Sequence, residues 1–204
     1  MPVTGAVLTG GSSTRMGVDK SLLDVDGLAL TAIVARALVG AGVTEVLTIG
    51  GNQDRLLGLE WVDRSIEDEF PKEGPLGGII TALHHASSDL VVILACDTPA
   101  ITFETPRRLI DAIEASPETA VAFAEVGGRI QPLTAVWRRS LALAELERAF
   151  AEGERSPRSV FDSLPALRVT DIDESGVDDV DFPIDLRRYA ETAKRPPTAN
   201  EGAR

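Results

Sequence analysis

The sequence predicts an α/β fold in which helices cover both faces of a doubly wound, mostly parallel sheet. Short β-branched runs alternate with longer segments of helical period, which is typical of βαβ units. Residues 90–95 are almost wholly apolar, as expected of a central strand buried on both faces. With 204 residues and 44% apolar composition, we expect one domain over residues 1–192 and a disordered tail over 193–204.

The expected elements alternate along the chain. The first half contains strands at 5–8, 46–49 and 61–62, a loop at 10–17 and a helix at 30–41. After a turn-rich run at 68–78, the second half contains helices at 79–86, 105–115 and 141–151 and strands at 90–95, 120–124 and 134–137. The helix at 30–41 has a clear signal, because its apolar residues form one stripe and Gly42 follows as a C-terminal stop.

Charge and cysteine content limit the function classes. The chain has 20 Lys and Arg against 32 Asp and Glu, a net charge of -12, which disfavours a nucleic-acid partner. An anionic ligand must then be met locally by backbone N–H groups, a few cations and a divalent metal. Cys96 is the only cysteine, which excludes an intrachain disulfide. With no secretory signal and no apolar run near the ~20 residues of a membrane span, we expect a cytoplasmic protein with no membrane partner.

The strongest functional signal is the run LTGGSSTRMGVDK at residues 8–20, directly after the first expected strand. The adjacent Gly10 and Gly11 let the backbone approach a nucleotide closely, and successive loop N–H groups form a nest for anions. Arg15 and Lys20 supply positive charge for a triphosphate. The spacings of the P-loop and of the dinucleotide fingerprint are both absent. The alternative for the glycines alone is a tight connection between a strand and a helix.

Three runs together resemble one protein family. Residues 8–20, residues 74–78 with Asp68 before them, and residues 96–99 have the order and spacing of molybdenum cofactor guanylyltransferases, within the NTP transferase superfamily. Weaker similarity at 153–155 and 179–186 extends the resemblance over about residues 5 to 190. It implies a three-layer α/β/α sandwich with a Rossmann-like sheet of the nucleotide-diphospho-sugar transferase type.

The resemblance also implies roles for individual residues. Those implied at the nucleotide are Leu8, Gly10, Gly11, Lys20, Asn52, Asp68, Gly74, Gly78 and Asp97. The implied catalytic residues are Arg15 and Lys20 on the phosphates and Asp97 on Mg²⁺, the implied cofactor. A carboxylate at the end of a buried strand also suits Mg²⁺ on chemical grounds, because such sites combine one or two carboxylates with phosphate oxygens. The alternatives are that Asp97 caps the turn before Pro99 and that Asp68 belongs to a solvated acidic loop.

The implied reaction transfers GMP from GTP to the phosphate of molybdenum-molybdopterin and releases pyrophosphate. An ionised phosphate is already a nucleophile, so catalysis reduces to positioning and charge stabilisation. His84 and His85 are therefore expected to be structural or solvent-facing, and Cys96 to pack at a strand end. The implied partners are GTP and a molybdopterin-type acceptor, with the protein a monomer or weak homo-oligomer that contacts cofactor-handling proteins transiently.

The late run departs from the family pattern, since Asp179-Val180-Asp181 stands where the guanylyltransferases typically have Asn-x-Asn. This resembles related cytidylyltransferases, where a late aspartate joins the metal site, and makes Asp181 a second metal candidate. Asp179, Arg155 and Arg158 are candidates for binding the acceptor, against the alternative that all are surface charges.

The choice of substrates therefore stays open at the sequence level. Gly10, Gly11 and residues 74–76 resemble the guanine-using branch of the superfamily. One alternative is a related transferase that uses CTP or another phosphorylated acceptor, such as a sugar phosphate or phospholactate. Another, from a different class, is a regulatory protein that binds nucleotide without turnover.

Overall fold

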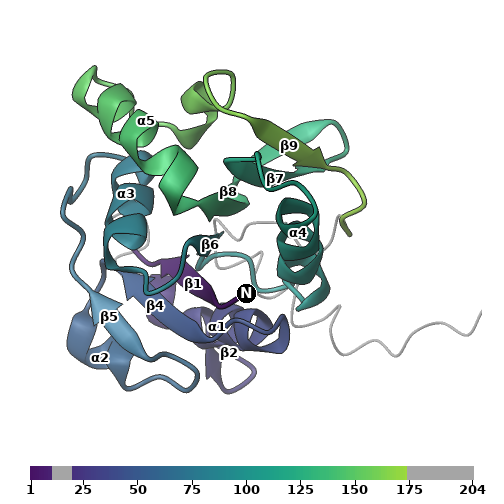
Figure 1. Ribbon diagram of the computed structural model, residues 1–204. Helices are drawn as coiled ribbons and strands as arrows, with labels where there is room; N and C mark the ends of the chain where they lie inside the picture. Colours follow the sequence, from purple (N-terminus) through teal and green to yellow (C-terminus); the bar gives the residue numbers. More distant parts are fainter. Residues whose placement is uncertain (11–19, 174–204) are drawn as a thin grey trace, which may run out of the picture.

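The computed structural model of the chain describes residues 1–10 and 20–173. Seven strands form one sheet in the order β5-β4-β1-β6-β8-β7-β9 (Figure 1). They are β1 (Val3–Leu8), β4 (Glu45–Ile49), β5 (Arg64–Ile66), β6 (Leu90–Ala95), β7 (Val121–Val126), β8 (Arg129–Arg138) and β9 (Ala166–Val169). Strands β5, β4, β1 and β6 are parallel, β8 is antiparallel to both β6 and β7, and β7 is parallel to β9. The predicted mostly parallel sheet is confirmed.

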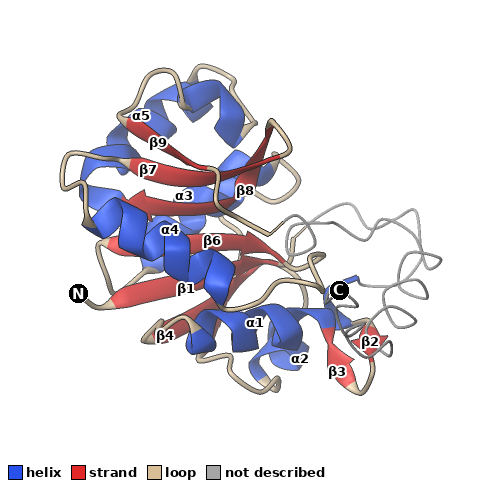
Figure 2. Ribbon diagram, turned by 90° about the vertical axis from the view of Figure 1, so that its right-hand side faces the viewer, coloured by secondary structure: helices blue, strands red, loops and turns tan. Residues whose placement is uncertain are grey.

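Helices cover both faces of the sheet, which gives three layers (Figures 1 and 2). The longer helices are α1 (Leu30–Gly40), α3 (Pro75–His85), α4 (Glu104–Glu114) and α5 (Arg139–Ala151), and α2 (Gln53–Leu57) is short. One apolar cluster lies between the sheet and helices α1 and α4, and a second lies between the sheet and helices α3 and α5. The predicted three-layer fold is confirmed.

The central strands β1 and β6 direct alternate side chains into the two apolar clusters. On β6, Val91 and Ile93 pack with α3 and α5, whereas Val92 and Leu94 pack with α1 and α4. Fully burying such a side chain stabilises the fold by about 1.5–3 kcal/mol. A slip by one residue would exchange the two sets of side chains, so the apolar pattern fixes the register of the sheet.

Two expected elements are placed differently from the prediction. Residues 61–62 do not form a strand: Trp61 has a φ of 65° and packs its ring against Arg36, and the strand β5 follows at 64–66. Helix α3 begins at Pro75 rather than at residue 79, with Gly74 as its N-cap. Proline suits the first helical position because the N–H that it lacks would have no partner inside the helix. The run at 74–78 is therefore a helix start and not a loop.

A hairpin that was not predicted from the sequence lies between residues 20 and 30. The 3₁₀ turn η2 (Lys20–Leu22) leads into β2 (Asp24–Val25), which pairs with β3 (Leu28–Ala29). Asp26 and Gly27 form the tip with φ values of 51° and 90°, as Asp-Gly does in tight hairpins. The hairpin packs on the start of α1 and closes the apolar cluster there.

Strand β8 is longer than the predicted strand at 134–137, since it begins at Arg129 and pairs with β7 across the turn at Gly127 and Gly128. Because β7 runs in the same direction as β6, this turn lies at the carboxyl edge of the parallel strands. Further elements that were not expected are α2, β9 and the 3₁₀ turn η3 (Pro157–Val160). In the part of the chain described, no helix is long and apolar enough to cross a membrane. The tail at 193–204 lies outside the described residues.

Candidate active site

The carboxyl ends of β1, β4, β5 and β6 meet at one edge of the sheet, because these strands are parallel. Ligands collect at this edge in open α/β sheets. The turn after β6 is tied to the end of β1, since the N–H of Cys96 donates to the carbonyl of Leu8 at 3.2 Å. Cys96 is buried at the strand end, as expected. Leu8 and Cys96, where two of the three sequence runs begin, therefore lie side by side.

The turn after β1 touches the turn after β4 through glycine backbone. The N–H groups of Thr9 and Gly10 both donate to the carbonyl of Ile49, at 3.0 and 3.1 Å, and the Thr9 hydroxyl lies 2.9 Å from the carbonyls of Ile49 and Gly50. Gly50 has a φ of 78°, and a Cβ there would lie 3.0 Å from the Cα of Gly10. Only glycine fits this junction without strain.

Asp68 stands beside the same junction. Its Oδ1 accepts hydrogen bonds from the Phe70 N–H at 3.0 Å and from the Thr81 hydroxyl at 3.2 Å. Its Oδ2 lies 3.7 Å from the position that a Cβ on Gly10 would take. The bonded oxygen therefore holds the carboxylate in place, and the other oxygen faces the Gly10 turn.

Gly74 and Gly78 lie at the start of α3, where Gly74 allows close packing. Gly74 has a φ of 89°, and a Cβ there would meet the carbonyl oxygen of Arg155 at 3.0 Å. A Cβ on Gly78 would lie 3.5 Å from the side chain of Leu8. Packing and the positive φ explain Gly74, whereas a Cβ at position 78 would make only an ordinary van der Waals contact. Binding of a nucleotide by either glycine stays a prediction.

Arg155 is engaged in contacts within the protein. Its guanidinium pairs with Glu73 at 2.7 Å, donates to the carbonyls of Phe150 and Glu154 at 2.8 Å, and lies 4.1 Å from the centre of the Phe150 ring. An acceptor phosphate would have to compete with these partners. Arg158 is exposed in η3. Acceptor binding by either arginine stays a prediction.

Asp97 lies half-buried in the turn that leaves β6, next to Thr98, whose hydroxyl donates to the Ala95 carbonyl at 3.1 Å. Within residues 1–10 and 20–173, no group of three or more His, Cys, Asp and Glu could hold a metal ion. A Mg²⁺ site needs only one or two carboxylates when substrate phosphates and water complete it.

Of the remaining candidate residues, Lys20 and Asn52 lie within the part of the chain that the structure describes. Lys20 is the first residue of η2. Ser21, the residue after it, is held by α1, because its carbonyl accepts a hydrogen bond of 2.7 Å from the Thr31 hydroxyl. Figure 2 shows the adjoining β2–β3 hairpin at the end of the molecule where β1 and β6 finish. The side chain of Asn52 accepts the Arg55 N–H at 3.1 Å and caps α2. The candidates Gly11, Arg15, Asp179 and Asp181 lie outside the described residues.

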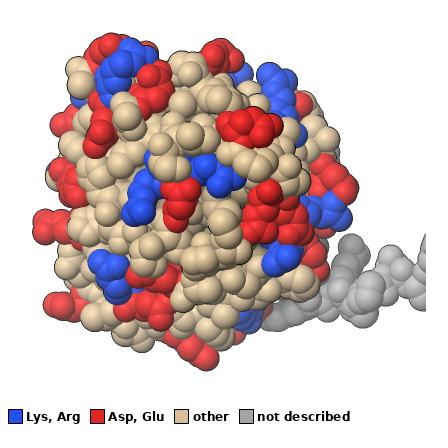
Figure 3. Space-filling model, in the orientation of Figure 1, with Lys and Arg blue, Asp and Glu red and all other residues tan. Residues whose placement is uncertain are grey.

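Charged side chains are mixed in sign over the face drawn in Figure 3. Lys and Arg form small groups that lie next to Asp and Glu. The structure pairs Arg64 with Glu45 at 3.0 Å and Arg148 with Glu145 at 2.6 Å. An anionic ligand would therefore have to be attracted by a local group of cations rather than by the general charge of the chain.

Comparison with known proteins places the chain in a family. Residues 5–169, which contain nearly all of the sheet, match the MobA-like NTP transferase domain. The chain belongs to this family. A molybdenum cofactor guanylyltransferase of Burkholderia vietnamiensis is 36% identical over 180 residues, which cover 84% of this chain and 87% of that protein. One of Pseudomonas putida is 36% identical over 159 residues, covering 76% and 80%. The resemblance found in the sequence is confirmed, and the chain is a nucleotidyltransferase.

Solved structures support the same fold. The molybdopterin-guanine dinucleotide biosynthesis protein A of Archaeoglobus fulgidus has a TM-score of 0.73 at 23% identity, covering 93% of this chain and 98% of that one. A 4-diphosphocytidyl-2C-methyl-D-erythritol synthase of Anaerococcus prevotii has a TM-score of 0.74 at 14% identity, covering 95% and 96%. Since proteins with guanine and cytidine in their names fit equally well, the backbone does not distinguish between the two bases.

Two residues that hold the candidate site together, Gly50 and Thr81, were not predicted from the sequence. Gly50 could have been found, because two glycines follow the strand expected at 46–49. Thr81 carries no signal of its own in the sequence, since its partner Asp68 lies 13 positions away. His84 and His85 lie on α3 and bond to Glu69 at the surface, which confirms the expectation that they are structural or solvent-facing.

Proposed function

We propose that the chain transfers GMP from GTP to the phosphate of molybdenum-molybdopterin and releases pyrophosphate. The observation that carries the proposal is the junction of Gly10, Gly50 and Asp68 at the sheet edge, next to the turn with Asp97. The close identity to guanylyltransferases over most of the chain supports the choice of GMP and of the molybdopterin acceptor.

Mg²⁺ fits this edge as a cofactor, with Asp97 as the protein ligand. A carboxylate oxygen is a ligand that Mg²⁺ prefers, and phosphate oxygens and water complete such sites. When bound, the ion would supply positive charge that neutralises the phosphate oxygens. The second candidate ligand, Asp181, lies outside the described residues.

The described residues have separate tasks in the proposed reaction. The N–H groups of Thr9 and Gly10 bond to the Ile49 carbonyl, so they shape the turn rather than bind phosphate. The oxygen of Asp68 that faces Gly10 accepts a hydrogen bond from the base or the ribose of the nucleotide. Lys20 contributes positive charge to the phosphates.

The reaction itself needs no proton transfer by the protein. An oxygen of the acceptor phosphate attacks the α-phosphorus, and a new P–O bond forms. The bond from the α-phosphorus to the bridging oxygen breaks, and pyrophosphate leaves with the electron pair. The enzyme contributes position and charge, which together account for large accelerations of phosphoryl chemistry.

GTP is expected to bind more tightly than ATP, CTP or UTP. A site that bonds the N–H, amine and carbonyl of guanine leaves groups unpaired with another base, at about 1–3 kcal/mol for each buried group. We therefore expect a preference of about tenfold to a hundredfold, measured by calorimetry with all four nucleotides in Mg²⁺. Tighter binding of CTP would assign the chain to the cytidine-using branch.

The acceptor is tested by pyrophosphate release. Mixtures of the enzyme, Mg²⁺ and the best-bound nucleotide are compared with molybdenum-molybdopterin, sugar 1-phosphates or phospholactate as acceptor. Release that depends on the molybdopterin supports the proposal. Release with a sugar phosphate or phospholactate alone would support the alternative acceptor class, while the transfer chemistry at the sheet edge would stand.

A further inference from the structure

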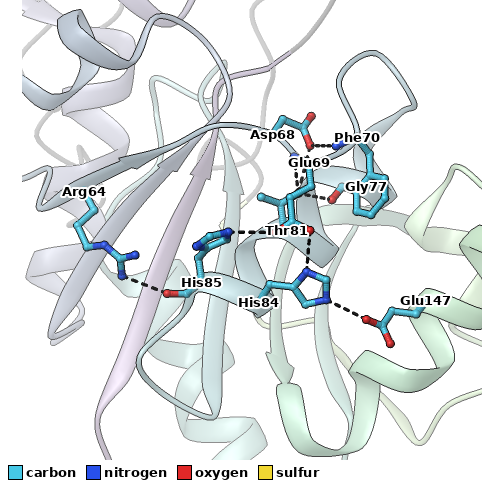
Figure 4. A network of polar contacts seen from close by, with 9 residues as sticks. All are labelled: Arg64, Asp68, Glu69, Phe70, Gly77, Thr81, His84, His85 and Glu147. Carbon is cyan, nitrogen blue, oxygen red and sulfur yellow. Dashed lines mark hydrogen bonds and ion pairs between the residues drawn. The ribbon is translucent and has the colours of Figure 1, made fainter.

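Helix α3 makes hydrogen bonds to the segment at 66–70, which carries Asp68. Thr81 is fully buried, and its hydroxyl accepts the N–H of Glu69 at 3.1 Å. The same hydroxyl lies 3.2 Å from Oδ1 of Asp68 and 3.0 Å from the carbonyl of Gly77 (Figure 4). One helical residue therefore bonds both the backbone and the side chain of this segment.

The Thr81 hydroxyl has a single proton for its two acceptors. A carboxylate is a stronger acceptor than a backbone carbonyl, so the bond to Asp68 is the stronger of the two when the hydroxyl points toward it. Together with the Phe70 N–H, the hydroxyl then bonds Oδ1 twice and leaves Oδ2 toward Gly10. The orientation of Asp68 thus depends on a residue that lies behind it.

His84 clamps the same segment from the next turn of α3. Its Nδ1 lies 2.8 Å from a carboxylate oxygen of Glu69, and its Nε2 lies 2.8 Å from one of Glu147 on α5 (Figure 4). A neutral imidazole carries one N–H, so one of these contacts would join two acceptors. Both contacts are favourable only for the imidazolium, which therefore ties the segment to α3 and α5.

The charges around His84 agree with this geometry. Partial burial by itself would lower the pKa of His84, but the hydrogen bonds and charges of Glu147 and Glu69 outweigh it, so the pKa is raised. Glu69 also accepts from His85 at 3.0 Å, and the two histidines lower its pKa against the effect of burial. The titratable groups that face His84 in the described structure are thus Glu69 from the Asp68 segment and Glu147 from α5.

We propose that Thr81 and His84 are positioning residues that hold Asp68 for the nucleotide, Thr81 by orienting the carboxylate and His84 by a clamp that depends on its proton. The proposal rests on the proposed function, in which Asp68 contacts the base or ribose. It adds that nucleotide affinity falls when His84 loses its charge, although His84 itself does not touch the nucleotide.

The first test compares Thr81→Val with Thr81→Ser. Valine keeps the shape but removes the hydroxyl, and we expect it to raise the Kd of the best-bound nucleoside triphosphate about tenfold with kcat changed much less. Serine keeps the hydroxyl and should restore the affinity. Thermal unfolding of both variants shows whether the fold is retained, and a serine variant as weak as the valine variant would overturn the role of the hydroxyl.

Asp68→Asn separates this proposal from the proposed function. If Asp68→Asn leaves the affinity unchanged for all four nucleoside triphosphates, the contact between Asp68 and the nucleotide is wrong. If Asp68→Asn weakens binding but Thr81→Val does not, only the positioning proposal is wrong. If both weaken binding, the double variant should lose less than the two single losses combined, because both changes disturb one carboxylate.

The second test follows nucleotide Kd from about pH 6 to about pH 9, on both sides of an ordinary histidine pKa. Because the pKa is raised in the folded protein, the clamp is present at low pH and is lost as pH rises through that value. Over this range, the nucleotide affinity of the wild type should fall more than the nucleotide affinity of His84→Gln. Titration of the nucleotide itself affects both proteins equally, so it cancels in the comparison.

Two further variants make the pH test specific. Glu147→Gln removes one charge partner and should move the midpoint to lower pH. His85→Gln is the matched control, because His85 makes one contact with Glu69 and the neutral tautomer that carries its proton on Nε2 can satisfy it. Parallel curves for the wild type and His84→Gln would overturn the proton-dependent clamp.

Discussion

Replacing Asp97 with alanine or asparagine is expected to reduce turnover about a hundredfold to a thousandfold, because loss of the proposed metal ligand would remove several kcal/mol of transition-state stabilisation. The fold should persist, since the side chain is half-exposed in a turn and does not belong to either apolar cluster. Pyrophosphate release at saturating Mg²⁺ measures the loss. Asparagine keeps the size of the side chain, so a loss with this variant reports on charge rather than on shape.

Asp111→Asn is the matched control for this experiment. Asp111 lies on the exposed side of α4, where it pairs with Arg107 at 3.0 Å. Loss of an exposed pair changes stability by about 1 kcal/mol or less, so turnover should stay within about twofold of wild type. Turnover of Asp97→Asn close to that of Asp111→Asn would end the assignment of Asp97 as a metal ligand.

Gly50→Ala should disrupt the junction of the β1 and β4 turns. The new Cβ would lie 3.0 Å from the Cα and 3.2 Å from the N of Gly10, and both are backbone atoms that cannot rotate away. The left-handed φ of 78° adds strain of about 1–2 kcal/mol. With the steric conflict, we expect a total loss of about 2–4 kcal/mol in the free energy of unfolding and a weaker Kd for nucleotide.

Gly128→Ala isolates the part of this effect that comes from the backbone angle. Gly128 has a φ of 74°, close to that of Gly50, but a Cβ there would meet nothing within 4 Å. The control should therefore lose only the backbone strain of about 1–2 kcal/mol, as measured by denaturant unfolding. If the two variants lose the same stability and both keep nucleotide affinity, the close approach at Gly50 has no role in the site.

The fold was predictable because its signals are local. The all-apolar run at 90–95 corresponds to a strand buried on both faces, and the residues of the apolar stripe at 30–41 are all buried in the structure. The errors occurred where one residue changes the outcome. Trp61 adopts a left-handed φ that its sequence does not announce, and Pro75 starts a helix within a run that also suits turns.

The candidate site was predictable only in part. Gly10, Asp68 and Asp97 follow expected strands or turns, so the parallel order of the strands brings them to one edge. Asn52 was assigned to the nucleotide from the resemblance, yet its side-chain oxygen caps a helix that was not expected. Thr81 and His84 could not be found, because their partners are set by how the segment at 66–70 crosses α3.

Because β8 runs antiparallel to β6 and β7, the turn between β7 and β8 borders the sheet edge that carries the candidate site, and the length of this turn can vary. The turn at Gly127 and Gly128 joins β7 to β8 beside the ends of the parallel strands, and the space around Gly128 is open. Each doubling of such a loop costs only about 0.6 kcal/mol in closure entropy. Insertions there would lengthen the border of this sheet edge without disturbing the pairing of the strands.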